Sequence, residues 1–177
     1  MKTHRLIRGT KPLLLSLPHM GACIPPDIRA RMKPEFLRLP DADPDLDRLL
    51  GFAARAGAGL FMPVHARYVA DLTRAEDDPL LVPMDIYKEG EEPDNIECIN
   101  RIAAYWLPYQ EALAEEKARL QKEFGAVRVI SIHSGAAGFA DMQHIPLSRE
   151  DYLDGSGAYD EEKALTLQAR LSGLLAA

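Results

Sequence analysis

Two histidines, His19 and His133, each follow a short apolar run and carry side chains that can bind a metal ion. The first run covers residues 13–17 and the second covers residues 127–132. Short apolar segments bounded by Pro or Gly are typical of buried parallel strands. In open α/β sheets, ligands bind beyond the carboxyl ends of such strands, where two neutral imidazoles could share one zinc ion. The alternative is a pair of hydrogen-bonded loop histidines with no metal.

The sequence between these histidines predicts helices and strands that would position them. A short helix is expected over residues 28–32. A Pro- and Asp-rich turn then leads into a helix over residues 46–54, with apolar residues three and four apart and Asp45 as its N-cap. Residues 60–64 and 67–72 are predicted to form two strands with a tight connection.

The second half of the chain begins with an acidic segment rich in Pro and Gly, residues 74–93, which we expect to be a long loop. A helical stretch capped by Asp94 or Asn95 follows and runs to Phe124, where Gly closes it. Pro108 interrupts this stretch and predicts a kink or two consecutive helices. Further on, residues 141–158 are expected to be a polar loop and residues 160–175 an amphipathic helix.

Length and composition favour a soluble globular protein with 177 residues, 47% hydrophobic and 27% charged. We expect one domain over residues 1–177, within which residues 139–177 are assigned only as a C-terminal loop and helix. A net charge of -6 argues against a nucleic-acid or membrane-surface partner. Cys23 and Cys98 are expected to be buried or half-buried free thiols. No apolar stretch is long enough for a signal peptide or membrane span, so a cytoplasmic protein is expected.

Five segments, taken in order, resemble the N-formylglutamate amidohydrolase family. Together they extend over roughly residues 10–135, and the match is strongest over residues 67–74, within the segment Ala-Arg-Tyr-Val-Ala-Asp-Leu-Thr-Arg. The segments are residues 17–21 (Leu-Pro-His-Met-Gly), 43–49, 66–74, 105–109 and 132–134. Each is weak alone, and their common order makes the resemblance specific.

The resemblance implies an α/β fold with a mixed central sheet and helices on both faces, of the zinc-carboxypeptidase (phosphorylase/hydrolase-like) type that aspartoacylase shares. It implies a zinc-dependent amide hydrolase that releases the acyl group from an N-acyl acidic amino acid such as N-formylglutamate. The expected partner is this small N-acyl amino acid, and the oligomeric state is left open. The alternative is a non-catalytic relative that binds an acidic metabolite or a protein through the same cleft.

For the metal, the resemblance implies His19 and His133 as ligands together with one carboxylate from the Asp-rich turn. Asp47 is slightly favoured over Asp43 because it continues into the matched segment. Catalytic zinc usually has three protein ligands and one open position, and it lowers the pKa of bound water to about 7. For both aspartates, the alternative is helix capping or a first-turn carboxylate that the helix dipole favours.

For the substrate, Arg74 is expected to bind a carboxylate, because a guanidinium presents a planar fork that matches it bidentately. Thr73 stands where the family has an asparagine and can still form a hydrogen bond. Arg67 is either a second anion contact or a structural ion pair with Asp71, and we favour the ion pair.

Other positions depart from the family pattern. Met20 replaces a serine, and Gln110 stands where a histidine is usual. The wider zinc hydrolase group has a late glutamate that acts as general base, and no segment after Ser134 matches it. The catalytic base is therefore unassigned, although His144 could serve.

The aromatic residues of the predicted helical stretch before Phe124 are expected to be helix core rather than substrate contacts. They are Tyr105, Trp106 and Tyr109.

Overall fold

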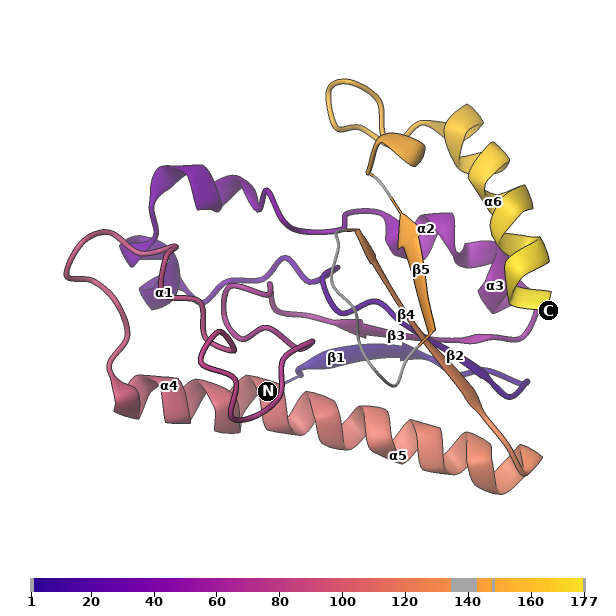
Figure 1. Ribbon diagram of the computed structural model, residues 1–177, viewed down its shortest axis with the longest axis horizontal. Coiled ribbons are helices and arrows are strands. Elements are labelled where there is room, and N and C mark those ends of the chain that lie inside the picture. Colours follow the sequence, from indigo (N-terminus) through magenta and orange to yellow (C-terminus); the bar gives the residue numbers. More distant parts are fainter. Residues whose placement is uncertain (1, 135–142, 148, 177) are drawn as a thin grey trace. The chain divides into compact units, whose positions relative to one another are not determined.

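The computed structural model describes residues 2–134, 143–147 and 149–176 and has an α/β fold with a mixed central sheet, as expected. The described strands form one sheet in the order β1-β3-β2-β4-β5 (Figure 1). The pairs β2–β3, β2–β4 and β4–β5 are parallel. The strands are β1 (His4–Ile7), β2 (Leu13–Ser16), β3 (Gly59–Pro63), β4 (Arg128–Ser134) and β5 (Gln143–Leu147).

The chain divides into two compact units, each built from three separate stretches. Unit 1 comprises residues 1–5, 18–42 and 62–119, and unit 2 comprises residues 6–17, 43–61 and 120–177. The expectation of one domain over the whole chain stays a prediction. The two units are described in turn.

Unit 2 contains β2 with its neighbours β3 and β4. Leu15 of β2 pairs with Leu60 on one side and with Ile130 on the other, and all three side chains are buried. Parallel strands buried on both faces need such continuous apolar sequence, which is why these runs predict them correctly. The predicted polar loop over residues 141–158 is wrong at β5, where backbone pairing to β4 creates a strand that no apolar run announces.

The helices of unit 2 are α2 (Leu46–Leu49), α3 (Gly51–Arg55) and α6 (Glu161–Ala176). The single helix predicted over residues 46–54 is thus two short ones that meet at Leu50. Asp45 holds the N-cap position but has a left-handed backbone with φ of 58° and makes no side-chain cap bond, so its predicted capping role is wrong. α6 matches its prediction and buries residues three and four apart. These are Ala164, Leu167 and Leu171.

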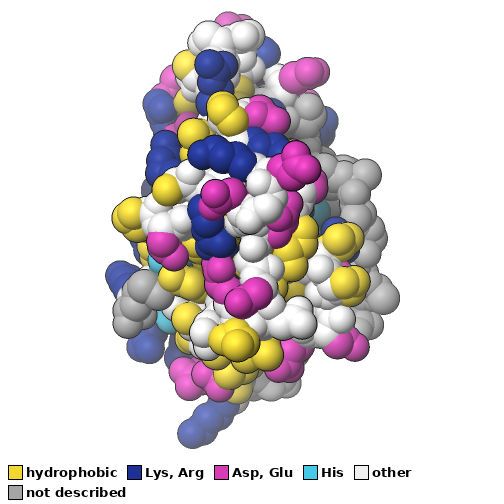
Figure 2. All heavy atoms as spheres, turned by 90° about the vertical axis from the view of Figure 1, so that its left-hand side faces the viewer, with side chains coloured by type: hydrophobic (Ala, Val, Ile, Leu, Met, Phe, Trp, Pro, Cys, Tyr) yellow, Lys and Arg dark blue, Asp and Glu magenta, His cyan; other side chains and the backbone are white. Residues whose placement is uncertain are grey.

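Unit 1 contains α1 (Pro26–Arg31), a 3-10 turn (Pro34–Arg38), α4 (Asn95–Arg101), a π-helical turn (Ile102–Trp106) and most of α5 (Leu107–Phe124). The Asp94 side chain accepts a hydrogen bond from the backbone N–H of Glu97, as predicted for the N-cap. Figure 1 shows α4 and α5 following one path along the bottom of the view. Basic and acidic side chains are interspersed on the face turned toward the reader in Figure 2.

The π-helical turn accommodates Pro108 within the helical stretch. A proline has no N–H to donate within the helix, and its ring crowds the carbonyl four residues earlier. Here Leu107 donates to the carbonyl of Ile102, five residues back, which widens the helix just before the proline. The predicted kink or break is therefore a local change of helical pitch.

Residues 74–94 contain turns and one isolated bridge, in agreement with the predicted loop. Part of this loop is tied to the segment that follows α1. Lys33 donates its N–H to the carbonyl of Ile86, and Lys88 donates to that of Arg31. Buried residues from both segments form one apolar cluster with the turn after β3. The cluster comprises Ile24, Ile28, Met32, Ala66, Tyr68, Val69, Ile86 and Tyr87.

No helix within the described ranges has both the length and the apolar character that crossing a membrane requires.

Candidate functional site

The centre of the candidate site in unit 1 is the carboxylate of Asp71, whose side chain is 2% exposed. Its Oδ1 lies 3.1 Å from Nε2 of His19 and accepts hydrogen bonds from both the hydroxyl and the N–H of Thr73. Its Oδ2 accepts a 2.6 Å bond from Arg67 and lies 3.9 Å from Nε of Arg74. One buried carboxylate thus joins four of the residues that the sequence analysis names.

The backbone around Asp71 differs from its prediction. Residues 67–72 form turns instead of the expected strand. In this conformation the N–H of Asp71 donates to the carbonyl of Leu81, and the N–H of Arg74 donates to the carbonyl of Asp71. In a straight strand Arg67 would lie too far along the chain from Asp71 to pair with it, and Arg74 would point to the opposite face. The turn lets both of them, and Thr73, reach the same carboxylate.

His19 is brought to Asp71 by a close approach of two backbone segments. A Cβ at Gly21 would lie 2.1 Å from the carbonyl oxygen of His65, so only glycine fits at this crossing. Two hydrogen bonds link Cys23 to the same segment, one to the carbonyl of Val64 and one from the N–H of Ala66. The loop that carries His19 is therefore tied to the chain leaving β3. Cys23 itself is exposed, contrary to expectation, and Cys98 is half-buried as expected.

The pairing with Asp71 determines how His19 can act. An ionised carboxylate can only accept a hydrogen bond, so Nε2 of His19 must be the protonated ring nitrogen. In the neutral ring, Nδ1 then carries the lone pair. Zinc-binding histidines typically donate their second ring nitrogen to a carboxylate in this way. The buried His19 therefore has the tautomer and the support of a zinc ligand through Nδ1.

The charge of Asp71 is stabilised by its neighbours. Burial alone raises the pKa of this carboxyl, but the hydrogen bond and electrostatic interaction with His19 and the positive charge of Arg67 outweigh it. Together with the Thr73 hydroxyl they hold the pKa of Asp71 well below its ordinary value. Asp71 is therefore a permanent anion at neutral pH.

Arg67 and Arg74 differ in their exposure and in how closely they pair with carboxylates of the protein. Arg67 is 26% exposed and pairs with Asp71, as the favoured interpretation of its role predicts. Arg74 is 36% exposed, and its NH1 lies 3.3 Å from Oδ2 of Asp78. Because its partners are more distant and its guanidinium is more exposed, Arg74 is the better placed of the two to bind an external carboxylate.

Unit 2 holds the other three predicted metal ligands. Asp43 is fully buried, and its charge contributes to a raised pKa of the buried Tyr152, whose largest cause is burial. Asp47 is partly exposed and accepts a bond from the N–H of Arg48. His133 is 4% exposed and lies within β4, where it pairs with Pro146 of β5. Of the two aspartates, Asp43 has the burial typical of a functional carboxylate, although Asp47 is favoured from the sequence.

Within the described residues, no group of three or more His, Cys, Asp or Glu side chains is arranged to hold a metal ion. The structure thus brings His19 together with Asp71, Arg67, Thr73 and Arg74 and forms no complete ligand set from the predicted residues. The side chain of His144, the other candidate base, lies outside the described residues. Glu150, Glu161 and Glu162 are exposed.

A buried histidine that the sequence analysis missed, His65, lies in the same unit. It is 8% exposed, and its ring packs edge-on against Tyr105 with 4.7 Å between centroids. Burial lowers its pKa, so the ring is neutral at pH 7. His65 could have been found from the sequence, because it follows the apolar segment of β3 just as His19 follows that of β2.

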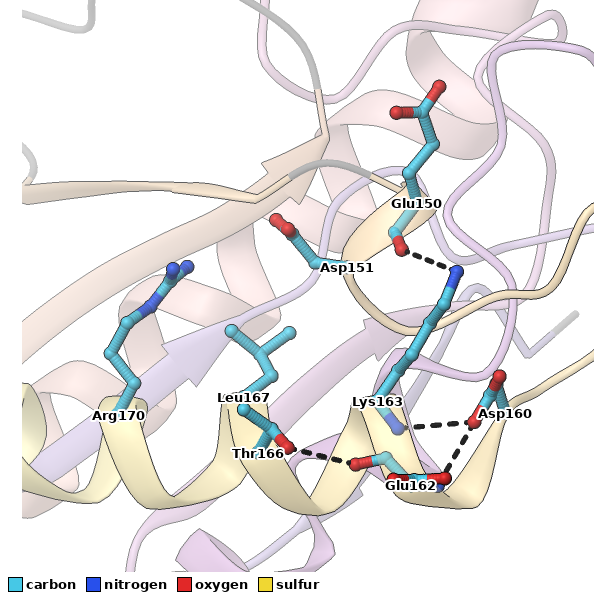
Figure 3. A pocket seen from close by; sticks show the side chains of 8 residues that line it. All are labelled: Glu150, Asp151, Asp160, Glu162, Lys163, Thr166, Leu167 and Arg170. Atoms are coloured by element: carbon cyan, nitrogen blue, oxygen red, sulfur yellow. Dashed lines mark hydrogen bonds between the residues drawn. The ribbon is translucent and has the colours of Figure 1, made fainter.

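A pocket of about 510 Å³ lies in unit 2 beside the start of α6 (Figure 3). Its charged groups support the fold: Lys163 donates to the carbonyls of Glu150 and Leu153, and Asp160 accepts from the first N–H groups of α6. None of the predicted site residues lines this pocket. It is lined by Glu150, Asp151, Asp160, Glu162, Lys163, Thr166, Leu167 and Arg170.

Comparison with known families identifies the chain's lineage. The family model described as N-formylglutamate amidohydrolase matches residues 11–172. The chain belongs to the N-formylglutamate amidohydrolase family. This confirms the resemblance drawn from the five segments and extends it beyond residue 135 to α6.

Two curated relatives of the family carry the name N-formylglutamate deformylase. The protein of Pseudomonas aeruginosa is 38% identical over 141 residues, which make up 72% of this chain and 53% of the relative. The protein of Pseudomonas putida is 33% identical over the same shares of both chains. The chain thus spans about half the length of the curated relatives that it matches.

Two solved structures share the fold of this chain. The N-formylglutamate amidohydrolase of Ralstonia eutropha aligns with a TM-score of 0.67 and 25% identity, covering 76% of this chain and 59% of that one. A gene product of Agrobacterium tumefaciens aligns with a TM-score of 0.65 and 22% identity, covering 79% and 59%. The second likeness concerns the fold alone.

Proposed function

We propose that the protein is a zinc-dependent amide hydrolase that cleaves the formyl group from N-formylglutamate, giving formate and glutamate. Family membership and the two deformylases that are 38% and 33% identical support this reaction. The chain spans about half the length of those relatives. The expected partner is the small N-formyl amino acid.

The observation that carries the proposal is the shared carboxylate of Asp71. It contacts a candidate metal ligand, His19, through Oδ1 and a candidate carboxylate-binding residue, Arg74, through Oδ2. Amide hydrolysis of an acidic substrate needs both functions near each other: activation of water and carbonyl, and a cation for the substrate carboxylate. Asp71 holds these two side chains within one cluster.

The donor chemistry fits zinc, because imidazole nitrogens and carboxylate oxygens are its usual protein ligands. His19 would bind it through Nδ1, and Asp71 would keep Nε2 protonated and the ring oriented. His133 and one of Asp43 or Asp47 stay the proposed further ligands. When bound, zinc supplies a more acidic water and polarises the amide carbonyl.

The chain's own residues would bind and orient the substrate. Arg74 would receive a carboxylate of N-formylglutamate in a bidentate contact, for which its exposed guanidinium is suited. Arg67, already bonded to Asp71, would add positive charge without leaving its ion pair. Thr73 would keep Asp71 in place through its hydroxyl rather than contact the substrate.

The test combines zinc content with ligand binding. Zinc per chain is measured by elemental analysis in the parent and in His19→Ala, and N-formylglutamate binding by calorimetry in the parent and in Arg74→Gln. We expect about one zinc per chain, lost in His19→Ala, and binding that Arg74→Gln weakens at least tenfold. Arg38→Gln, an exposed arginine of the same unit, is the matched control and should bind like the parent.

Formate release then separates turnover from binding. Zinc and binding without formate would favour a non-catalytic relative that retains the acidic ligand, and absence of both would overturn the proposal. A cytoplasmic location is part of the proposal, because the described cysteines, Cys23 and Cys98, are free thiols.

A further inference from the structure

Two side chains, Trp106 at the end of the π-helical turn and Gln110 in α5, hold the turn that carries Arg74. Nε1 of Trp106 donates a 3.0 Å hydrogen bond to the backbone carbonyl of Arg74. Nε2 of Gln110 donates a 2.8 Å bond to the carbonyl of Leu72. The two bonded carbonyls belong to the residues on either side of Thr73. The two side chains therefore hold the backbone on both sides of Thr73, which is bonded to Asp71.

The helix presents these two donors because of its π-helical turn. Residues 106 and 110 are four apart and share one face of the helix. The π-helical turn at Ile102–Trp106 adds a residue to the preceding turn, which lets both Tyr105 and Trp106 pack on the same apolar cluster. That cluster consists of Ala70, Leu81 and Val82, from the segments on either side of the turn. π-helical turns inside α-helices often occur at functional sites.

We propose that Trp106 and Gln110 form a brace that fixes the 71–74 turn and so presents the Arg74 guanidinium to the substrate carboxylate. They are positioning residues, since they act through the backbone of the turn. The consequence for substrate rests on the proposed function, whereas the brace itself does not. Because the bonds go to carbonyl oxygens, what the brace requires at each position is an N–H donor.

This requirement can be tested at position 110. Glutamine donates an N–H to the carbonyl of Leu72, and a histidine side chain also carries an N–H donor. A glutamate of the same length has two acceptor oxygens and no donor when ionised. Gln110→His should therefore keep the brace, and Gln110→Glu should break it. Trp106→Phe removes only the indole N–H while keeping an aromatic ring in the cluster.

Hydrogen exchange tests the brace without reference to activity. The N–H groups of Thr73 and Arg74 are bonded within the turn, to the side chain and the carbonyl of Asp71. Their exchange should be at least threefold faster in Trp106→Phe and in Gln110→Glu, and close to the parent in Gln110→His. The amide of Cys98 in α4 should not change. Unchanged exchange at Thr73 and Arg74 in both disrupting variants would overturn the brace.

The matched control lies in the same helix. Gln121 also donates its side-chain amide to a backbone carbonyl, that of Gly125, and Gln121→Glu makes the same chemical change away from the turn. It should leave the exchange of Thr73 and Arg74 at the parent rate. A global loosening by either glutamate would show at Cys98 as well, and would count against a local brace.

Substrate binding tests the consequence. The dissociation constant for N-formylglutamate should rise roughly three- to tenfold in Trp106→Phe and Gln110→Glu and return toward the parent value in Gln110→His. Faster exchange with unchanged binding would overturn the link between the brace and Arg74. If the parent binds no N-formylglutamate, the proposed function fails, and the exchange rates alone decide whether the brace exists.

Discussion

The buried carboxylate of Asp71 holds together side chains from two separate segments of the chain. It bonds to His19, Arg67 and Thr73 and lies near Arg74, with two of these partners cationic at neutral pH. Removing one partner of a buried ionic group costs more than the bond itself, because the remaining charges stay desolvated. The residue is therefore important for stability as well as for the proposed chemistry.

We expect Asp71→Asn to lower the free energy of unfolding by about 3 kcal/mol, since Arg67 loses its counter-charge and His19 loses its ionised acceptor. Urea denaturation followed by circular dichroism measures the change. Asp77→Asn, an exposed carboxylate six residues further on, should stay within about 0.5 kcal/mol of the parent. Equal stability of the two variants would show that the Asp71 cluster contributes little.

Arg74→Lys keeps the positive charge but removes the guanidinium fork that can bind a carboxylate through two hydrogen bonds. If Arg74 binds a substrate carboxylate, the lysine variant should raise the KM for N-formylglutamate roughly tenfold and that for its uncharged diamide, in which both carboxylates are amides, much less. Steady-state kinetics on both substrates measures the difference. A similar rise for both would assign Arg74 a structural role within the turn.

The elements of unit 1 are joined by a second ionic cluster, at the first turns of α4. Glu97 pairs with Arg31 at the end of α1 and with Arg101 one turn along α4. Arg101 is 3% exposed and also donates to the hydroxyl of Tyr87, in the loop between the helices. Glu97 thus links α1, α4 and the 74–94 loop, which helps to position the helix that braces Arg74.

The stability contributed by Glu97 should depend on pH. Burial raises its pKa, but the bonds from Arg31 and Arg101 outweigh this and leave it below the ordinary 4.5. Because the folded pKa is depressed, the stabilisation is fully present above about pH 4.5 and is lost as the pH falls through the folded pKa. Glu97→Gln should cost roughly 2 kcal/mol at pH 7 and progressively less below pH 4.5.

Urea denaturation of the parent and Glu97→Gln across this range measures the effect. Glu92→Gln, an exposed carboxylate just before α4, is the control and should match the parent at every pH. A cost of Glu97→Gln that stays constant from neutral to acidic pH would contradict an ionic role for Glu97.

At the scale of the whole molecule, each unit is assembled from three stretches that are distant in sequence. In unit 2 the last of these stretches ends in α6, whose start is joined to α2 by the ion pair of Glu161 with Arg48. Arg48 also lies over the ring of Tyr159, with 4.0 Å from Cζ to the ring centroid. The family model matches the chain as far as residue 172, so the match includes most of α6.

We expect Leu171→Ala to destabilise the protein by about 3 kcal/mol, because this side chain is fully buried and its truncation leaves a cavity. Leu165→Ala removes the same atoms from a residue of α6 that is 64% exposed and should cost less than about 0.5 kcal/mol. Thermal unfolding of both variants compares them. Equal melting temperatures would mean that α6 is not packed as the structure has it.

The sequence by itself determined the elements whose signals are local. The apolar runs at β2, β3 and β4 predict buried parallel strands, and the spacing of Leu167 and Leu171 predicts the buried face of α6, because periodicity reports burial directly. The N-cap at Asp94 likewise needs only a short side chain ahead of a helix. The place of His19 after an apolar run also marks it as a functional candidate, and the family resemblance added Arg74.

Only the tertiary structure decided how these residues are joined. His19 and Asp71 are 52 residues apart, and no local pattern shows that they share a hydrogen bond. The 67–72 segment has the composition of a strand, yet contacts of its polar side chains with distant segments hold it in turns. β5 likewise exists because β4 offers unpaired backbone groups beside it. Partners remote in the chain override local propensity, and these partners build the candidate site.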